Sequence, residues 1–68
     1  MRIVKVEKAE STLILSAEEI ATINNAMNEA LEALAANPDE FHTRVGATVP
    51  AVKELLASIN AVVRQMAA

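Results

Sequence analysis

The fold is decided by residues 49–66, which read VPAVKELLASINAVVRQM. Large apolar residues recur here at alternating spacings of three and four, the period that predicts an amphipathic α-helix. Leu55 and Val62 lie beside this stripe and widen it, so that the apolar face is broad enough for two neighbours. One neighbour is expected inside the fold, and the second is either part of the same core or another chain. The stripe consists of Val49, Val52, Leu56, Ile59, Val63 and Met66.

A turn and a short helix precede this segment. Asn37 is followed by proline, which stops a helix at the preceding residue and is favoured in the first turn of the next one. We therefore expect Asn37 to cap a short helix over residues 38–45, which Gly46 closes in the left-handed conformation. Either Thr48 or Val49 then caps the final helix.

Residues 16–36 predict another long helix. Ser16 and Glu19 have the spacing of a capping box, in which each side chain accepts a hydrogen bond from the other residue's backbone N–H. Apolar residues follow at helical spacing, whereas Asn24 and Asn28 lie on the other face. The apolar stripe consists of Ile20, Ile23, Met27, Leu31 and Leu34.

The N-terminal part of the chain has the composition of β-strands. Residues 2–7 and 11–15 are rich in branched side chains, and the short connection between them has the length of a hairpin loop. An alternative is one long edge strand that pairs across a dimer axis. The fold class predicted is α+β: an N-terminal β-hairpin or strand pair followed by three helices, long-short-long. Residues 1–68 form a single small domain.

The size and composition of the chain restrict how it is stabilised. A domain of 68 residues usually needs disulfides, a metal ion or self-association to support its small core. The sequence has no cysteine, and its one histidine, His42, is insufficient for a zinc site. Because hydrophobic residues make up 53% of the chain, close helix packing and self-association remain.

The charge distribution argues against nucleic acid and membranes. The net charge is −3, and residues 10–32 contain five glutamates and no basic residue. Nucleic-acid affinity depends on cations that replace the counterions of phosphates, so nucleic acid is an unlikely partner. An acidic surface instead suits a basic protein partner, or simply solubility. The sequence shows neither a membrane span nor a signal peptide, and we expect a cytoplasmic protein.

The sequence offers little chemistry for catalysis. A nucleophile needs a base within hydrogen-bond reach, and no serine has a histidine at the spacing of a known motif. The carboxylate pairs Glu18-Glu19 and Asp39-Glu40 both fall where helices begin, and capping accounts for them. We expect no enzyme activity, no cofactor, no metal ion and no small-molecule substrate.

The segment Phe41–Gly46 is the most distinctive stretch, because it contains the only phenylalanine, histidine and glycine of the chain. In one interpretation Phe41 and Val45 pack inward, Gly46 turns the chain, and His42 and Arg44 face solvent. In the other, His42 and Arg44 form a partner-facing projection, since arginine is enriched at binding hot spots. The predicted partner-binding residues are His42, Arg44, Asn24, Asn28, Leu55 and Val62.

Residues 38–66 also fit a helix-turn-helix in outline. The second helix, however, opens with a proline, apolar residues and one lysine, Lys53, where base reading requires several polar or basic side chains. His42 is also bulky where the two helices of such a motif need a small residue. A DNA-associated regulator is therefore the alternative function.

Several short motifs carry a resemblance. The chain resembles a group of small, uncharacterised bacterial proteins that have no known activity, and the resemblance implies a recurring small domain. The motifs are Leu15-Ser16-Ala17-Glu18-Glu19, Asn25-Ala26-Met27-Asn28-Glu29-Ala30-Leu31, Glu40-Phe41-His42-Thr43-Arg44-Val45-Gly46 and Lys53-Glu54-Leu55-Leu56.

The predicted function is that of a small acidic protein-binding module. We expect it to be homodimeric and to act as an inhibitor or immunity-type protein, or as an assembly protein. Its partners are an unidentified protein and a second copy of the chain.

Overall fold

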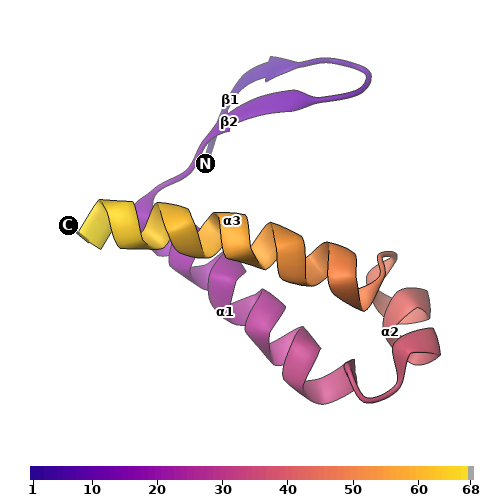
Figure 1. Cartoon of the computed structure of the whole chain (residues 1–68). Coiled ribbons are helices and arrows are strands. Elements are labelled where there is room, and N and C mark those ends of the chain that lie inside the picture. Colours follow the sequence, from indigo (N-terminus) through magenta and orange to yellow (C-terminus); the bar gives the residue numbers. More distant parts are fainter. Residues whose placement is uncertain (68) are drawn as a thin grey trace.

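A computed structural model describes residues 1–67 of the chain. Two strands, β1 (Arg2–Val6) and β2 (Ser11–Ile14), form an antiparallel hairpin. Three helices follow, α1 (Ala17–Leu34), α2 (Pro38–Val45) and α3 (Val49–Ala67). In Figure 1 the hairpin stands apart from the two long helices, and α2 closes the far end of the helix pair. The predicted α+β fold with long, short and long helices is confirmed.

The helix boundaries follow from local capping chemistry. At α1 the Glu19 N–H donates to the Ser16 hydroxyl over 3.1 Å, and the Ser16 N–H donates to the Glu19 carboxylate over 2.9 Å. At α2 the Glu40 N–H donates to the Asn37 side chain over 3.3 Å. Gly46 ends α2 with a φ of 81°, a conformation that is cheap for glycine and strained for other residues.

The hairpin contains a β-bulge that was not expected from the sequence. Ile3 pairs with Leu13 and Lys5 pairs with Thr12, so Val4 is an extra residue on β1. Because side chains alternate along a strand, the extra residue shifts the alternation. As a result, Ile3 shares one face with Val6 and Leu13.

The core is small and lies between the helices. Ile20 of α1 and Val52 and Leu56 of α3 are buried where the two long helices pack together. Phe41 of α2 is fully buried, with no exposed surface, and α2 contacts both long helices. Phe41 therefore closes one end of the α1–α3 seam.

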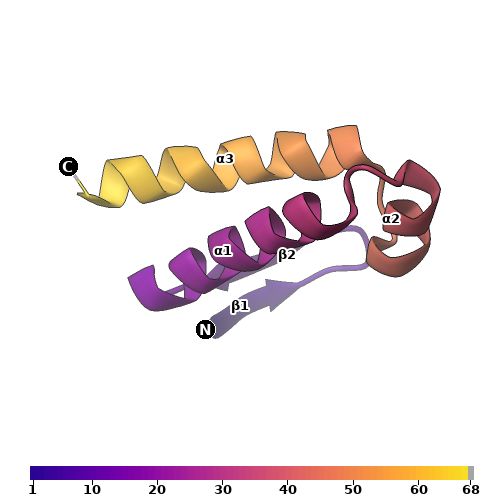
Figure 2. The same cartoon turned by 90° about the horizontal axis from the view of Figure 1, so that it is seen from below.

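The two long helices form one layer, and Figure 2 shows α1 and α3 side by side in it. The whole chain, with the hairpin, measures 35 × 33 × 16 Å along its principal axes. The radius of gyration is 13.4 Å, whereas a compact chain of this length has about 11 Å. The accessible surface is 5300 Å², whereas a folded monomer of this mass exposes about 4,100 Å². The fold thus leaves about 1,200 Å² more surface exposed than its size requires.

We predict that Phe41→Ala removes most of the stability of the fold. Truncating a buried phenylalanine costs about 3–5 kcal/mol, and a small domain has roughly 5 kcal/mol in total. Urea denaturation followed by circular dichroism measures the loss. The neighbouring exposed His42→Ala is the control, with an expected change within about 0.5 kcal/mol. A Phe41→Ala protein as stable as the control would show that Phe41 does not close the core.

Candidate protein-binding surfaces

An apolar groove runs between α1 and α3 on one side of the helix layer. It has a volume of about 340 Å³ and is open to solvent. Leu55, which is 56% exposed, forms part of its wall together with the exposed Val45. Alanines on α1 leave the groove wide because their side chains are small. The lining residues are Ala26, Met27, Ala30, Val45, Ala47, Val52 and Leu55.

The apolar surface continues along α3 beyond the groove. Val62 and Met66 are exposed, and they follow Leu55 at spacings of seven and eleven residues. Such spacings place all three on one side of a helix, next to the half-buried Ile59. The structure therefore brings the predicted residues Leu55 and Val62 together on one exposed apolar face.

The hairpin presents a second exposed apolar surface. Ile3 and Val6 are 64% and 69% exposed, and Leu13, which shares their face, is exposed as well. No residue of β1 or β2 has its Cα within 8 Å of a Cα of a described helix. Figure 1 shows the hairpin standing off the helix layer, joined to it only at its base. The two strands thus lie apart from the helices, and the hairpin is attached to the helix layer at its base.

The base of the hairpin lies on the groove side of the helix layer. The amino group of Met1 binds both carboxylate oxygens of Glu19, over 2.6 and 2.5 Å. Met1 also lines a small depression with Ile23, one helical turn after Glu19. Because Ala26 and Ala30 follow Ile23 along the same side of α1, the hairpin and the groove share a side.

Asn24 and Asn28 lie on a different flank of α1, and neither lines the groove. The Asn28 side chain donates to the backbone carbonyl of Asn24 over 3.0 Å. The Asn24 Oδ1 atom is buried and finds no hydrogen-bond partner among residues 1–67. The two asparagines therefore form a local pair, separate from Leu55 and Val62.

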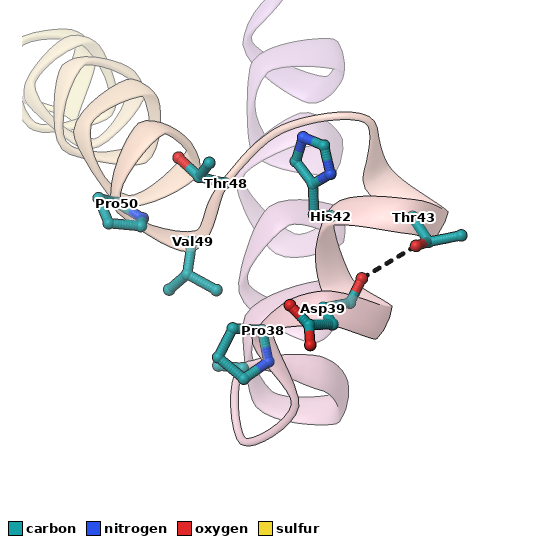
Figure 3. Close-up of a pocket in the computed structure, with 8 residues that line it drawn as sticks. Pro38, Asp39, His42, Thr43, Thr48, Val49 and Pro50 are labelled. Atoms are coloured by element: carbon teal, nitrogen blue, oxygen red, sulfur yellow. Dashed lines mark hydrogen bonds between the residues drawn. The ribbon is translucent and has the colours of Figure 1, made fainter.

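His42 and Arg44 do not form one projection. His42 lines an open depression of about 680 Å³ between α2 and the start of α3, and Arg44 does not. In Figure 3, His42 and Asp39 line it from α2, opposite Thr48 and Val49. Arg44 instead forms an ion pair with Glu40, one turn earlier on α2, over 2.9 Å.

Three further findings concern residues 1–67. The axes of α2 and α3 are bent by 62° at the break between the two helices. No group of three His, Asp or Glu side chains in this range could hold a metal ion. No single described helix is long and apolar enough to cross a membrane. The bent pair of α2 and α3, taken together, reaches the required length and apolar composition, and nothing beyond length and composition supports a span.

Comparison with known proteins gives no relative, since no protein family, curated protein or solved structure matches the chain. The resemblance to small bacterial proteins therefore stays a prediction. The candidate binding surfaces are therefore identified from the structure of this chain alone.

Some residues of these surfaces were not among the predicted partner-binding residues. Val45 was expected to pack inward from the short helix, yet it is exposed at the rim of the groove. Ala26 and Ala30 of α1 line the groove and were not among the predicted residues either. In the hairpin, Ile3 and Leu13 share a face only because of the bulge. No local sequence signal reveals any of these arrangements.

The ion pair at Glu19 predicts a dependence of stability on acid pH. The Met1 amino group and the Ser16 N–H lower the pKa of Glu19 from 4.5 to about 2. A carboxylate with a lowered pKa in the folded state stabilises the fold above pH 4.5, and this contribution is lost as the pH falls toward 2. Melting temperatures of the wild type and Glu19→Gln should therefore converge over this range.

The matched control for that experiment is Glu32→Gln, because Glu32 forms no ion pair or side-chain hydrogen bond within residues 1–67. The difference in melting temperature between Glu32→Gln and the wild type should vary less with pH than the difference between Glu19→Gln and the wild type. Parallel melting curves for Glu19→Gln and the wild type down to pH 2 would show that the Met1–Glu19 contact is not formed.

We predict that Arg44→Ala leaves the fold intact. Its ion pair with Glu40 is exposed, and exposed pairs of this kind contribute less than about 1 kcal/mol to stability. Thermal unfolding of the variant beside the wild type measures the change in melting temperature. A sharp fall in melting temperature would make Arg44 a structural residue.

Proposed function

We propose that this protein is a small non-enzymatic protein-binding module that associates first with a second copy of itself. The observation that carries the proposal is the unused surface of the fold, about 1,200 Å² more than a monomer of this mass exposes. The exposed large apolar side chains lie at two places, the groove face and the hairpin.

The size of this surplus supports association with another protein chain. Standard protein interfaces bury about 800 Å² per partner, and permanent homodimers bury more. Soluble monomers rarely expose apolar patches larger than a few hundred Å². A chain that exposes Ile3, Val6 and Leu55 in water therefore gains by covering them with another protein.

The thinness of the fold points in the same direction. Domains are normally built from two packed layers around a core, and here α1 and α3 form a single layer. Only Ile20, Phe41, Val52 and Leu56 are buried in the described chain. A second copy supplies the missing layer, which explains how so small a core supports an ordered structure.

We place the protein among assembly or inhibitor proteins that act by occupying a surface. The acidic outer face of α1 gives the dimer a site for a basic partner, since complementary charges accelerate and orient association. The alternative function, a regulator that binds DNA, stays a prediction, and no specific observation favours it. Helix α3 carries two basic residues for phosphate contacts, Lys53 and Arg64.

The test is a comparison of two glutamate substitutions on α3. Leu55→Glu places a charge on the exposed apolar face, where burial against another chain makes it costly. Ala61→Glu adds the same charge at an exposed position of the same helix, about 120° around the helix axis from Leu55 and away from the buried Leu56. We expect light scattering to show dimers for the wild type and Ala61→Glu, and monomers for Leu55→Glu. Circular dichroism checks that both variants remain helical.

A wild-type protein that is monomeric at every accessible concentration would contradict the proposal. Equal association of Leu55→Glu and Ala61→Glu would show that the groove face is not the contact surface.

A further inference from the structure

Building on the proposed self-association, we infer that the hairpin β1–β2 is an exchanged arm. The hairpin of one copy covers the apolar groove of a second copy, and the second copy returns the contact. The occupant of the groove is therefore a named segment of this same chain, residues 2–14 of the partner copy.

The first argument is the isolation of the hairpin. A two-stranded hairpin is at best marginally stable in water unless it packs against something else. Here its Cα atoms approach no described helix of its own chain within 8 Å, and both strands are exposed along their length. Its order therefore requires a surface that its own helices do not provide.

The second argument is the match between the hairpin and the groove. The five residues of β1 extend about 17 Å, and the nineteen residues of α3 extend about 28 Å, so a hairpin fits along the helix layer. The β-bulge places Ile3, Val6 and Leu13 on one face. Such a face completes the second layer that the helix pair lacks, as in other α+β folds.

The third argument is charge complementarity between the two parts of the chain. Residues 1–15 carry three basic and two acidic side chains, a net charge of +1. Residues 16–67 carry seven acidic and three basic side chains, a net charge of −4, and α1 contains four glutamates and no base. Contact of a hairpin with the partner's helices brings parts of opposite net charge together, an attraction between the parts as wholes, because Lys5 lies on the hairpin face opposite Ile3 and Leu13. Contact of hairpin with hairpin, or of helices with helices, brings like charges together.

The fourth argument is the area that a reciprocal exchange buries. If each copy covers its surplus surface, the two copies together bury about 2,400 Å². This falls within the roughly 2,000–5,000 Å² of permanent homodimers. A twofold axis makes the exchange reciprocal, because each copy then gives and receives the same segment.

The attachment of the hairpin is compatible with exchange. It connects to α1 through Leu15 and the extended Ser16, whose φ and ψ are −71° and 164°. Its other contact with the helix is the Met1–Glu19 ion pair at the same end. Figure 1 shows the arm attached at this end, with its loop remote from α1.

The decisive experiment is isotope-filtered nuclear magnetic resonance on the full chain. Carbon-13-labelled and unlabelled protein are mixed, so that the filtered spectrum reports only contacts between copies. We expect intermolecular cross-peaks from the methyl groups of Val6 and Leu13 to those of Met27, Ala30 and Leu55.

A cysteine pairing experiment gives an independent readout, since the native chain has no cysteine. Val6→Cys protein is mixed with Ala30→Cys protein and oxidised. We expect the mixed disulfide to exceed both the Val6→Cys and the Ala30→Cys homodisulfides several-fold. The control partner is Ala61→Cys, at an exposed position about 120° around α3 from Leu55, which should form little mixed disulfide.

The outcomes separate this inference from the proposed function. A dimer in light scattering without intermolecular hairpin-to-helix cross-peaks overturns the exchanged arm and leaves the binding module standing. A dominant Val6→Cys homodisulfide overturns it in favour of a sheet formed by two hairpins. A monomer at all concentrations overturns both.

Discussion

The structure depends on the seam between α1 and α3, which Phe41 closes at one end. Ile20, Val52 and Leu56 are the other buried apolar side chains of residues 1–67. The seam uses only the facing edges of the two helix stripes, so the outer edge with Leu55 and Val62 remains in water. A core this small does not offset the conformational entropy of ordering a chain of this length by a wide margin. The same constraint accounts for the thin layer, the surplus surface and the unsupported hairpin.

The surplus surface relates the fold to its proposed function. A stable monomer would bury Ile3, Val6 and Leu55. In this chain they are exposed, on the hairpin and in the groove, which lie on the same side of the helix layer. Under the proposed function, binding another chain is part of the folding equilibrium, because whatever binds the native state also stabilises it. On this view the second copy is both a structural element and the first partner. The acidic face of α1 stays available for a basic protein.

The fold was predictable wherever local chemistry decides it. Ser16, Asn37 and Gly46 set helix ends through bonds and backbone angles within a few residues, and the structure confirms them. The candidate surface was predictable in part. The widening of the α3 stripe by Leu55 and Val62 identified an exposed apolar face, since a core of this size has room for one side of a helix only. His42 and Arg44 were expected to act together, yet residues two apart on a helix point in different directions.

The sequence by itself determined the elements, their order and their apolar sides, because capping, turn chemistry and helical period act over a few residues. The tertiary structure alone decided which parts of those sides are covered. The bulge at Val4, the exposure of Val45 and the separation of the hairpin from the helices depend on contacts between distant segments. Such contacts are set by the packing of the whole chain, and no local pattern encodes them.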